Sequence, residues 1–247
     1  MAEKTKKVAS VILRYCNQSR SRARNLRILL HHLAKIPTLE IVVSVMDKDF
    51  TPHVEVKKIF TPGTFESSRA NNIGAAAATT DILIFQDADI IFEASCYTKI
   101  IQSICAGQES VRVGEQCVNL GAVNVPKLQR NPTAFLKHRF KTCLRDAPGA
   151  CIALSRSAFI KVGGHCELFK VYGWEDCYFR YKVKTLTKQS CLNQQMIHLP
   201  HEENFQMGHQ ADNAHLYQEL LYTDGGNCIK LSERDRKFLL EQYPTLR

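Results

Sequence analysis

The stretch that decides the fold is Asp81-Ile82-Leu83-Ile84-Phe85-Gln86-Asp87-Ala88-Asp89. Its short apolar run predicts a buried β-strand that ends at a pair of aspartates. Similar runs predict earlier strands at residues 8–13, 40–46 and, more weakly, 54–60. Helices are predicted between them by a leucine stripe at residues 26, 29, 30 and 33 and by an alanine-rich segment at residues 67–78. Strands that alternate with helices indicate a mainly parallel sheet in an open α/β domain.

The aspartate pair has a spacing that suits metal binding. In an extended backbone Asp87 and Asp89 project on the same side. Their carboxylate oxygens suit Mg²⁺ or Mn²⁺ shared with a diphosphate. Ligands of open α/β sheets bind at the carboxyl ends of the strands, and Asp47 follows another predicted strand end. The alternative interpretation is a strand-end turn with two solvated aspartates.

A second cluster, Gly173-Trp174-Glu175-Asp176, precedes a helical pattern that extends to about Val183. One interpretation is an apolar platform for a sugar beside a carboxylate that acts as a general base. The other is a packed tryptophan followed by an acidic pair that favours the start of a helix. Before this cluster, residues 151–154 predict another buried strand and residues 155–162 a short helix.

A third cluster is His198-x-x-His201, in a segment that predicts a short edge strand at residues 197–201. A neutral imidazole could complete the metal site begun by the aspartate pair, or the two histidines could lie on the surface. His31 and His32 have no comparable context, and on the first predicted helix they are expected to face solvent.

Composition limits the class of protein. The chain has 247 residues, 45% of them hydrophobic, and a net charge of +9, which is typical of a globular chain and excludes a disordered one. No apolar run reaches the roughly 18 residues of a transmembrane helix, and the polar start does not resemble a signal peptide. Ten cysteines without C-x-x-C spacing indicate reduced thiols and a cytoplasmic location. The basic balance suits polyanions, anionic membranes or phosphate-bearing ligands, or is simply solvated.

In their order along the chain, these motifs resemble the GT-A-fold glycosyltransferases that use nucleotide sugars. The galactosyltransferase/N-acetylgalactosaminyltransferase group, with its β1,4-galactosyltransferases and bacterial chondroitin-type polymerases, is the most similar. The resemblance covers roughly residues 8 to 205. It is carried by the strand and uridine-contacting turn at residues 11–17, Asp47, Arg69-x-x-Asn72-x-Gly74, Asp87-Ala88-Asp89, the segment 162–167 with Gly173–Asp176, and the late histidines.

The resemblance implies a metal-dependent enzyme that transfers a hexosyl or N-acetylhexosaminyl group from a UDP-sugar to a hydroxyl acceptor, with inversion. It implies Mn²⁺ or Mg²⁺ on Asp89 and on His201, with His198 as the second choice of histidine. It makes Asp176 the catalytic base, with Glu175 beside it on the sugar hydroxyls. The other donor-binding residues that it implies are Arg14, Tyr15, Asp47, Arg69, Asn72, Asp87 and Trp174.

We expect a single glycosyltransferase domain over residues 1–247, with a nucleotide-sugar-binding half at 8–106, an acceptor and catalytic half at 107–205 and a C-terminal helical extension at 206–247. Leu13 stands where the family usually has proline and Lys182 where it often has arginine, and the anchor of secretory members is missing. A bacterial cytosol, or a host cytoplasm for a viral enzyme, fits this pattern. Two alternatives stay open: a phage-type enzyme that glycosylates hydroxymethylated DNA bases, holding an anionic acceptor at the basic segment Lys127 to Arg145, and a catalytically silent nucleotide-sugar-binding module.

Overall fold

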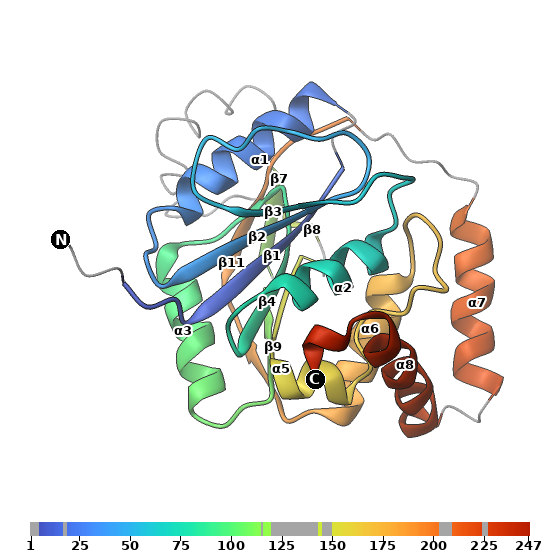
Figure 1. Ribbon diagram of the computed structural model, residues 1–247. Coiled ribbons are helices and arrows are strands. Elements are labelled where there is room, and N and C mark those ends of the chain that lie inside the picture. The colour runs from blue at the N-terminus through green and yellow to red at the C-terminus, as the bar shows by residue number, and fades with distance from the viewer. Residues whose placement is uncertain are drawn as a thin grey trace.

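A seven-stranded sheet, in the order β10-β6-β9-β4-β1-β2-β3, forms the centre of the computed structural model (Figure 1). The structure describes residues 5–16, 19–114, 116–119, 143–144, 150–202, 209–223 and 227–247. All strands of this sheet run in one direction except β9, which is antiparallel to its neighbours β4 and β6. Its strands are β1 (Ala9–Tyr15), β2 (Leu39–Val45), β3 (Lys57–Phe60), β4 (Ile82–Asp87), β6 (Ser110–Val113), β9 (Cys151–Ser155) and β10 (Gln189–Leu192). The expected mainly parallel α/β sheet is therefore confirmed.

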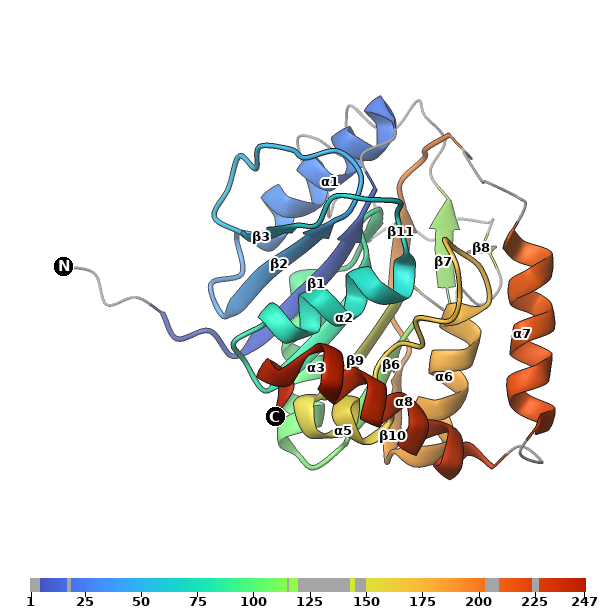
Figure 2. The same ribbon diagram turned by 45° about the vertical axis from the view of Figure 1, so that its right-hand side comes forward.

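Two apolar layers cover the faces of this sheet because successive strand residues point to opposite sides. Val11 and Leu13 of β1 pack with α1 (Arg20–Leu33) and α3 (Ala94–Cys105). Ile12 packs on the other face, where Figure 2 shows α2 and α8 in front of the sheet. The helices of that face are α2 (Ser67–Ala77), α5 (Arg156–Lys161), α6 (Glu175–Leu186) and α8 (Cys228–Gln242). The helix α7 (Gln210–Thr223) lies beside α6, and the short helix η3 (Pro244–Leu246) ends the chain.

A second, small sheet sets the position of the late histidines. Its order is β5 (Ile90–Ile91), β11 (Gln195–His198), β7 (Gln116–Asn119) and β8 (Cys143–Leu144). His198 pairs with Ile90, the residue directly after Asp89. The amide of Leu199 also donates a hydrogen bond of 2.8 Å to the Asp89 carbonyl. A strand pairing across more than 100 residues therefore brings the histidine segment to the end of β4.

Two sequence expectations need correction, and one strand has a direction that the sequence did not predict. The segment around Ile197 is an inner strand, since β11 pairs with β5 on one side and with β7 on the other. The strand β9 is buried as expected but runs against the rest of the sheet. His32 does not face solvent: it lies on the buried stripe of α1 beside Leu29 and Leu33, and its Nε2 is 2.7 Å from the Phe92 carbonyl.

Three further observations concern the start of α1, the basic segment and the lengths of the helices. Ser19 is the N-cap of α1, where its hydroxyl accepts from the amide of Arg22. The segment Lys127 to Arg145 lies outside the described residues apart from Cys143 and Leu144. Within the part of the chain that is described, no helix has the length and apolar character needed to cross a bilayer.

Candidate active site

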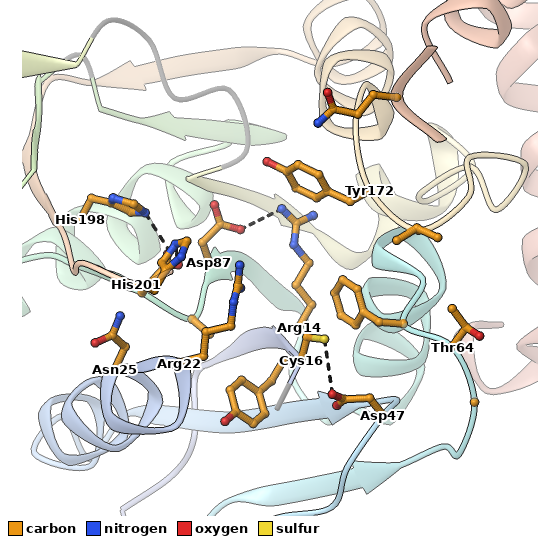
Figure 3. Close-up of a pocket in the computed structure, with 17 residues that line it drawn as sticks. Arg14, Cys16, Arg22, Asn25, Asp47, Thr64, Asp87, Tyr172, His198 and His201 are labelled. Carbon is orange, nitrogen blue, oxygen red and sulfur yellow. Dashed lines mark hydrogen bonds and ion pairs between the residues drawn. The ribbon is translucent and has the colours of Figure 1, made fainter. Parts of the chain in front are cut away.

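The carboxyl ends of β1, β2 and β4 open into a cavity of about 510 Å³ (Figure 3). This is the position at which open α/β sheets bind their ligands. The strand ends contribute Arg14, Tyr15, Cys16, Asp47, Asp87 and Asp89. The rest of the wall comes from Arg22, Asn25, Gly63, Thr64, Phe65, Ala88, Val171, Tyr172, His198, His201 and Gln210. Of the twelve site residues expected from the sequence, seven line this cavity.

Arg14 is the centre of a carboxylate cluster at one side of the cavity. Its Nη2 lies 2.8 Å from Asp87 Oδ1 and 2.8 Å from Asp176 Oδ2, and its Nη1 lies 2.9 Å from Asp176 Oδ1. Glu175 Oε1 is 3.8 Å from Nη1, which also donates to the hydroxyl of Ser67 at 2.7 Å. The parallel register of β1 and β4 places Arg14 opposite Asp87, while Asp176 arrives in the first turn of α6. The guanidinium is therefore shared among three carboxylates.

The carboxylates of this cluster differ in pKa for physical reasons. Burial raises the pKa of Asp87 to about 7, against the attraction of Arg14. Burial and the charge of Asp176 likewise raise the pKa of Glu175 to about 7. Burial would also raise the pKa of Asp176, but the charge and the two hydrogen bonds of Arg14 outweigh it and lower that pKa. Asp176 is consequently the carboxylate of the cluster that stays ionised at neutral pH.

Asp89, His198 and His201 form the second cluster of the cavity, with one potential ligand atom from each lying within 4.8 Å of the others. Asp89 Oδ2 is 3.0 Å from His201 Nε2 and 3.7 Å from His198 Nε2. Hydrogen bonds from both histidines outweigh burial and hold the pKa of Asp89 well below its usual range. One carboxylate and two imidazoles are a donor set that suits a divalent transition metal such as Mn²⁺.

The orientation of the His201 ring suits a metal ion at this cluster. Its Nδ1 lies 3.0 Å from the carbonyl of Glu202, and a carbonyl oxygen can only accept, so Nδ1 carries the proton. Nε2 therefore faces Asp89, where its hydrogen bond to the carboxylate raises the pKa of His201, and a metal ion would replace the proton on this nitrogen. Such a hydrogen bond from the second ring nitrogen commonly orients metal-binding histidines. The trio can therefore hold a metal ion without rearrangement of the ring.

The helix α1 holds the histidine segment in place from the other side. The side-chain amide of Asn25 donates to the carbonyls of Leu199 and Pro200, at 3.3 and 3.1 Å. Arg24 donates to the Pro200 carbonyl at 2.9 Å, and the hydroxyl of Ser21 donates to the Glu202 carboxylate. These contacts tie the loop after β11 to the first turns of α1.

Figure 3 shows Cys16 and Asp47 at the opposite end of the cavity. Tyr15, directly before Cys16 at the end of β1, also lines the cavity. The Cys16 thiol lies 3.5 Å from Asp47 Oδ2, and the ring of Tyr15 packs edge-on against Phe50 at 5.4 Å. Burial, with the charge of Asp47, raises the pKa of Cys16 to about 12. A thiol with this pKa is not a nucleophile at neutral pH. This end therefore offers an aromatic ring and a carboxylate for binding rather than for chemistry.

Five expected site residues do not line the cavity: Arg69, Asn72, Trp174, Glu175 and Asp176. Glu175 and Asp176 contact Arg14, which lines the cavity. Asp176 also lines a separate cavity of about 10 Å³ next to that arginine. Arg69 is exposed on α2. Asn72 is buried and donates to the carbonyl of His165 at 2.9 Å. Trp174 is 43% exposed and packs against the ring of Tyr217. Donor contacts by Arg69, Asn72 and Trp174 stay predictions.

Sequence reasoning missed Arg22, Tyr172 and Gln210. Arg22 lines the cavity from the first turn of α1, and its buried Nε has no hydrogen-bond partner among the described residues. The sequence did contain a signal for Arg22, because it is the third residue after the N-cap Ser19 of a helix that follows the end of β1. Gln210, at the start of α7, had no signal of this kind.

Comparisons with known proteins agree with this architecture. Residues 10–163 match the model of glycosyl transferase family 2, which is more than half of the chain. Among solved structures, TarS 1-349 of S. aureus is similar with a TM-score of 0.55 and 16% identity, over 87% of this chain and 66% of that one. The catalytic domain of Drosophila β1,4-galactosyltransferase 7, in complex with xylobiose, has a TM-score of 0.47 and 13% identity, over 82% and 67%. The chain thus spans slightly less than two thirds of the TarS chain.

No curated protein matches the sequence significantly. With a family match that covers β1 through α5 and a cavity at the carboxyl ends of β1, β2 and β4, the chain belongs to glycosyl transferase family 2.

Proposed function

We propose that this glycosyltransferase moves a hexosyl or N-acetylhexosaminyl group from a UDP-sugar to a hydroxyl acceptor, with inversion and with Mn²⁺ or Mg²⁺. One observation carries the proposal. A single cavity joins a possible metal site, Asp89 with His198 and His201, to the cluster of Arg14 and its carboxylates. Transfer from a nucleotide sugar needs these two elements within one sugar's length of each other, because the leaving group and the attacking hydroxyl meet at one carbon.

The donor lies along the cavity in this proposal. Tyr15 and Asp47 hold the uracil at one end, and Arg22 supplies positive charge to the diphosphate. Asp89, His198 and His201 would hold a divalent cation, which when bound would supply positive charge to the leaving diphosphate. Arg22 suits its role because its guanidinium is not committed to a carboxylate among the described residues, whereas Arg14 is.

Asp176 removes the proton of the acceptor hydroxyl. Its lowered pKa keeps it ionised, and 18% of its side chain is exposed, against 2% for Glu175. Glu175 is further committed to the loop before it, because its Oε2 accepts from the Gly173 amide at 2.5 Å. Arg14 donates to both oxygens of Asp176, and each oxygen keeps a further lone pair that can accept from the acceptor hydroxyl. Arg14 thus orients the Asp176 carboxylate, which also accepts a hydrogen bond from the acceptor hydroxyl.

The test is a panel of UDP-sugars with Mn²⁺ and with saccharide, protein and hydroxymethylated-DNA acceptors. We expect transfer from at least one UDP-sugar, loss of transfer with EDTA, and an inverted anomeric configuration in the product by NMR. The variant His201→Ala should lose metal-dependent transfer, whereas His215→Ala, an exposed histidine of α7, should keep it. UDP binding without turnover on any acceptor would instead identify a silent binding module.

A further inference from the structure

The helix α7 contributes to the cavity although it belongs to no motif of the family. It lies after the segment that matches the family model. Its first residue, Gln210, lines the cavity together with Val171 and Tyr172, which lie in the loop before α6. Figure 2 shows α7 beside α6, the helix whose first turn carries Glu175 and Asp176. The role of α7 follows from how it holds this loop.

The loop before α6 has an unfavourable backbone conformation. Among the described residues, Val171 and Trp174 are the non-glycine residues with positive φ, at 57° and 67°. Gly173 between them has a φ of 110°, which other residues rarely adopt. Residues with side chains persist in such conformations only where their surroundings hold them, and these positions cluster at functional sites.

Asn213 of α7 stabilises this loop through hydrogen bonds to its backbone. Its Oδ1 accepts from the amide of Lys170 at 3.1 Å, and its Nδ2 donates to the carbonyls of Lys170 and Tyr172, at 2.8 and 3.2 Å. Asn213 is buried, so these bonds to the loop are shielded from water. An asparagine amide is needed here because the loop presents both a donor and acceptors.

Two neighbours on the same face of α7 support the loop as well. Gln210, Asn213 and Tyr217 are spaced as i, i+3 and i+7, and therefore share one side of the helix. The backbone of Gly173 packs against Gln210, where even an added Cβ would come within 3.3 Å of Gln210 Cγ. The ring of Tyr217 lies 5.3 Å from that of Trp174. The loop is thus fitted to this face along its length.

Tyr172 lies where the transferred sugar must lie. Figure 3 shows its ring near the guanidinium of Arg14, far from Cys16 and Asp47 at the other end. The charges of Arg14, Asp87 and Asp176 all act on its hydroxyl. The reacting carbon has to sit between the diphosphate and the base, so the sugar lies at the Tyr172 end.

We propose that α7 forms the sugar-recognition wall of the cavity. Gln210 and Tyr172 contact hydroxyls of the transferred sugar, and Asn213 is a positioning residue that holds Tyr172 in place. An amide and a phenol both donate and accept, which suits sugar hydroxyls. This inference rests on the proposed function, and it identifies the residues that select the sugar within the donor.

The experiment compares kcat/KM for UDP-glucose, UDP-galactose, UDP-N-acetylglucosamine and UDP-N-acetylgalactosamine, together with the Kd of UDP by calorimetry. We expect Gln210→Ala to lower the ratio between the best sugar and its epimer about tenfold, because a site that hydrogen-bonds a hydroxyl rejects the wrong epimer. The Kd of UDP should stay within about twofold. The matched control is Gln218→Ala, the same change at an exposed position of α7, which should alter neither quantity.

Asn213→Asp tests the positioning role, because it keeps the size of the side chain and removes the donor to Lys170 and Tyr172. We expect the same loss of sugar selectivity, with the Kd of UDP retained. A lowered melting temperature with unchanged selectivity would identify a purely structural asparagine and overturn its role. Unchanged selectivity in both variants, or equal use of all four sugars by the wild type, would overturn the inference while UDP binding and transfer stand. A wild type that binds no UDP would overturn the proposed function itself.

Discussion

Replacing Lys182 by methionine should destabilise the fold strongly, because it removes the buried one of the two cations that pair with the Asp235 carboxylate. Lys182 Nζ lies 2.7 Å from Asp235 Oδ2 and also donates to the Gly164 carbonyl at 2.9 Å. The lysine side chain is fully buried and that of Asp235 is 6% exposed. The pair joins α6, which carries the proposed base, to α8. Breaking such a pair from one side typically costs about 3–5 kcal/mol.

The structure favours the lower end of this range. After the change, Asp235 keeps a hydrogen bond from Tyr178 at 3.3 Å and an ion pair with Arg234 at 2.8 Å. An unfolding entropy of about 2.1 cal/mol/K per residue gives about 0.5 kcal/mol/K for a chain of this length. A loss of about 3 kcal/mol then lowers the melting temperature by about 6 °C.

Thermal unfolding followed by circular dichroism measures this shift. The matched control is Lys161→Met, the same change in an exposed pair with Glu109 at 2.9 Å, which should cost less than about 1 kcal/mol. The double variant Lys182→Met/Asp235→Leu should recover part of the loss, because it removes the stranded charge. Equal shifts for Lys182→Met and Lys161→Met would refute the reasoning.

Three further predictions address the site and its pH dependence. Asp176→Asn should lower kcat at least about 100-fold and leave the Kd of UDP unchanged, because a positioned general base contributes about that factor or more; wild-type turnover would remove Asp176 as the base. Arg22→Ala should raise the Kd of UDP about tenfold or more, as expected for a lost charge-assisted contact, with an unchanged Kd contradicting its diphosphate role. Burial lowers the pKa of His165 to about 3, against about 6.5 in the unfolded chain. The unfolded state therefore takes up a proton that the folded state refuses as the pH falls from 6.5 to 3. This group alone should lower the free energy of unfolding by about 2 kcal/mol between pH 7.5 and pH 5. In urea titrations, the free energy of unfolding of His165→Phe should therefore fall less steeply with decreasing pH than that of the wild type. An equally steep fall in both proteins would contradict a lowered pKa of His165.

Local sequence patterns predicted the strands and helices of the first half of the chain, because each of these elements has a characteristic periodicity of apolar residues. The run around Ile12 and the leucine stripe of α1 have the periodicities of a strand and a helix, and the structure has both. The reversed direction of β9 could not be read in this way, since a buried apolar run looks the same in either direction. The burial of His32 likewise depends on a loop 60 residues away.

The sequence predicted that the late histidines join Asp89, but it predicted neither the strand pairing that brings them there nor the contact of Arg14 with Asp176. His198 and His201 meet Asp89 because β11 pairs with β5, which no spacing rule could reveal. Arg14 and Asp176 are 162 residues apart, so their bidentate contact depends on tertiary structure. The resemblance to the family placed Arg14 among the donor-binding residues. In the fold, nearby carboxylates already occupy it.

The sharing of one guanidinium among three carboxylates has a consequence for the order of binding. Arg14 contacts three carboxylates, Asp87, Glu175 and Asp176, so its single positive charge is already balanced before a ligand enters. In the proposed function, a diphosphate that enters beside Asp87 and Asp89 would be favoured by a divalent cation that enters with it, in addition to the charge of Arg22. Affinity for UDP and affinity for the metal are then thermodynamically linked, and each must tighten the other by the same factor. Under the proposed function, the crowding of carboxylates around Arg14 would thereby make the nucleotide and the cation bind as a single ligand.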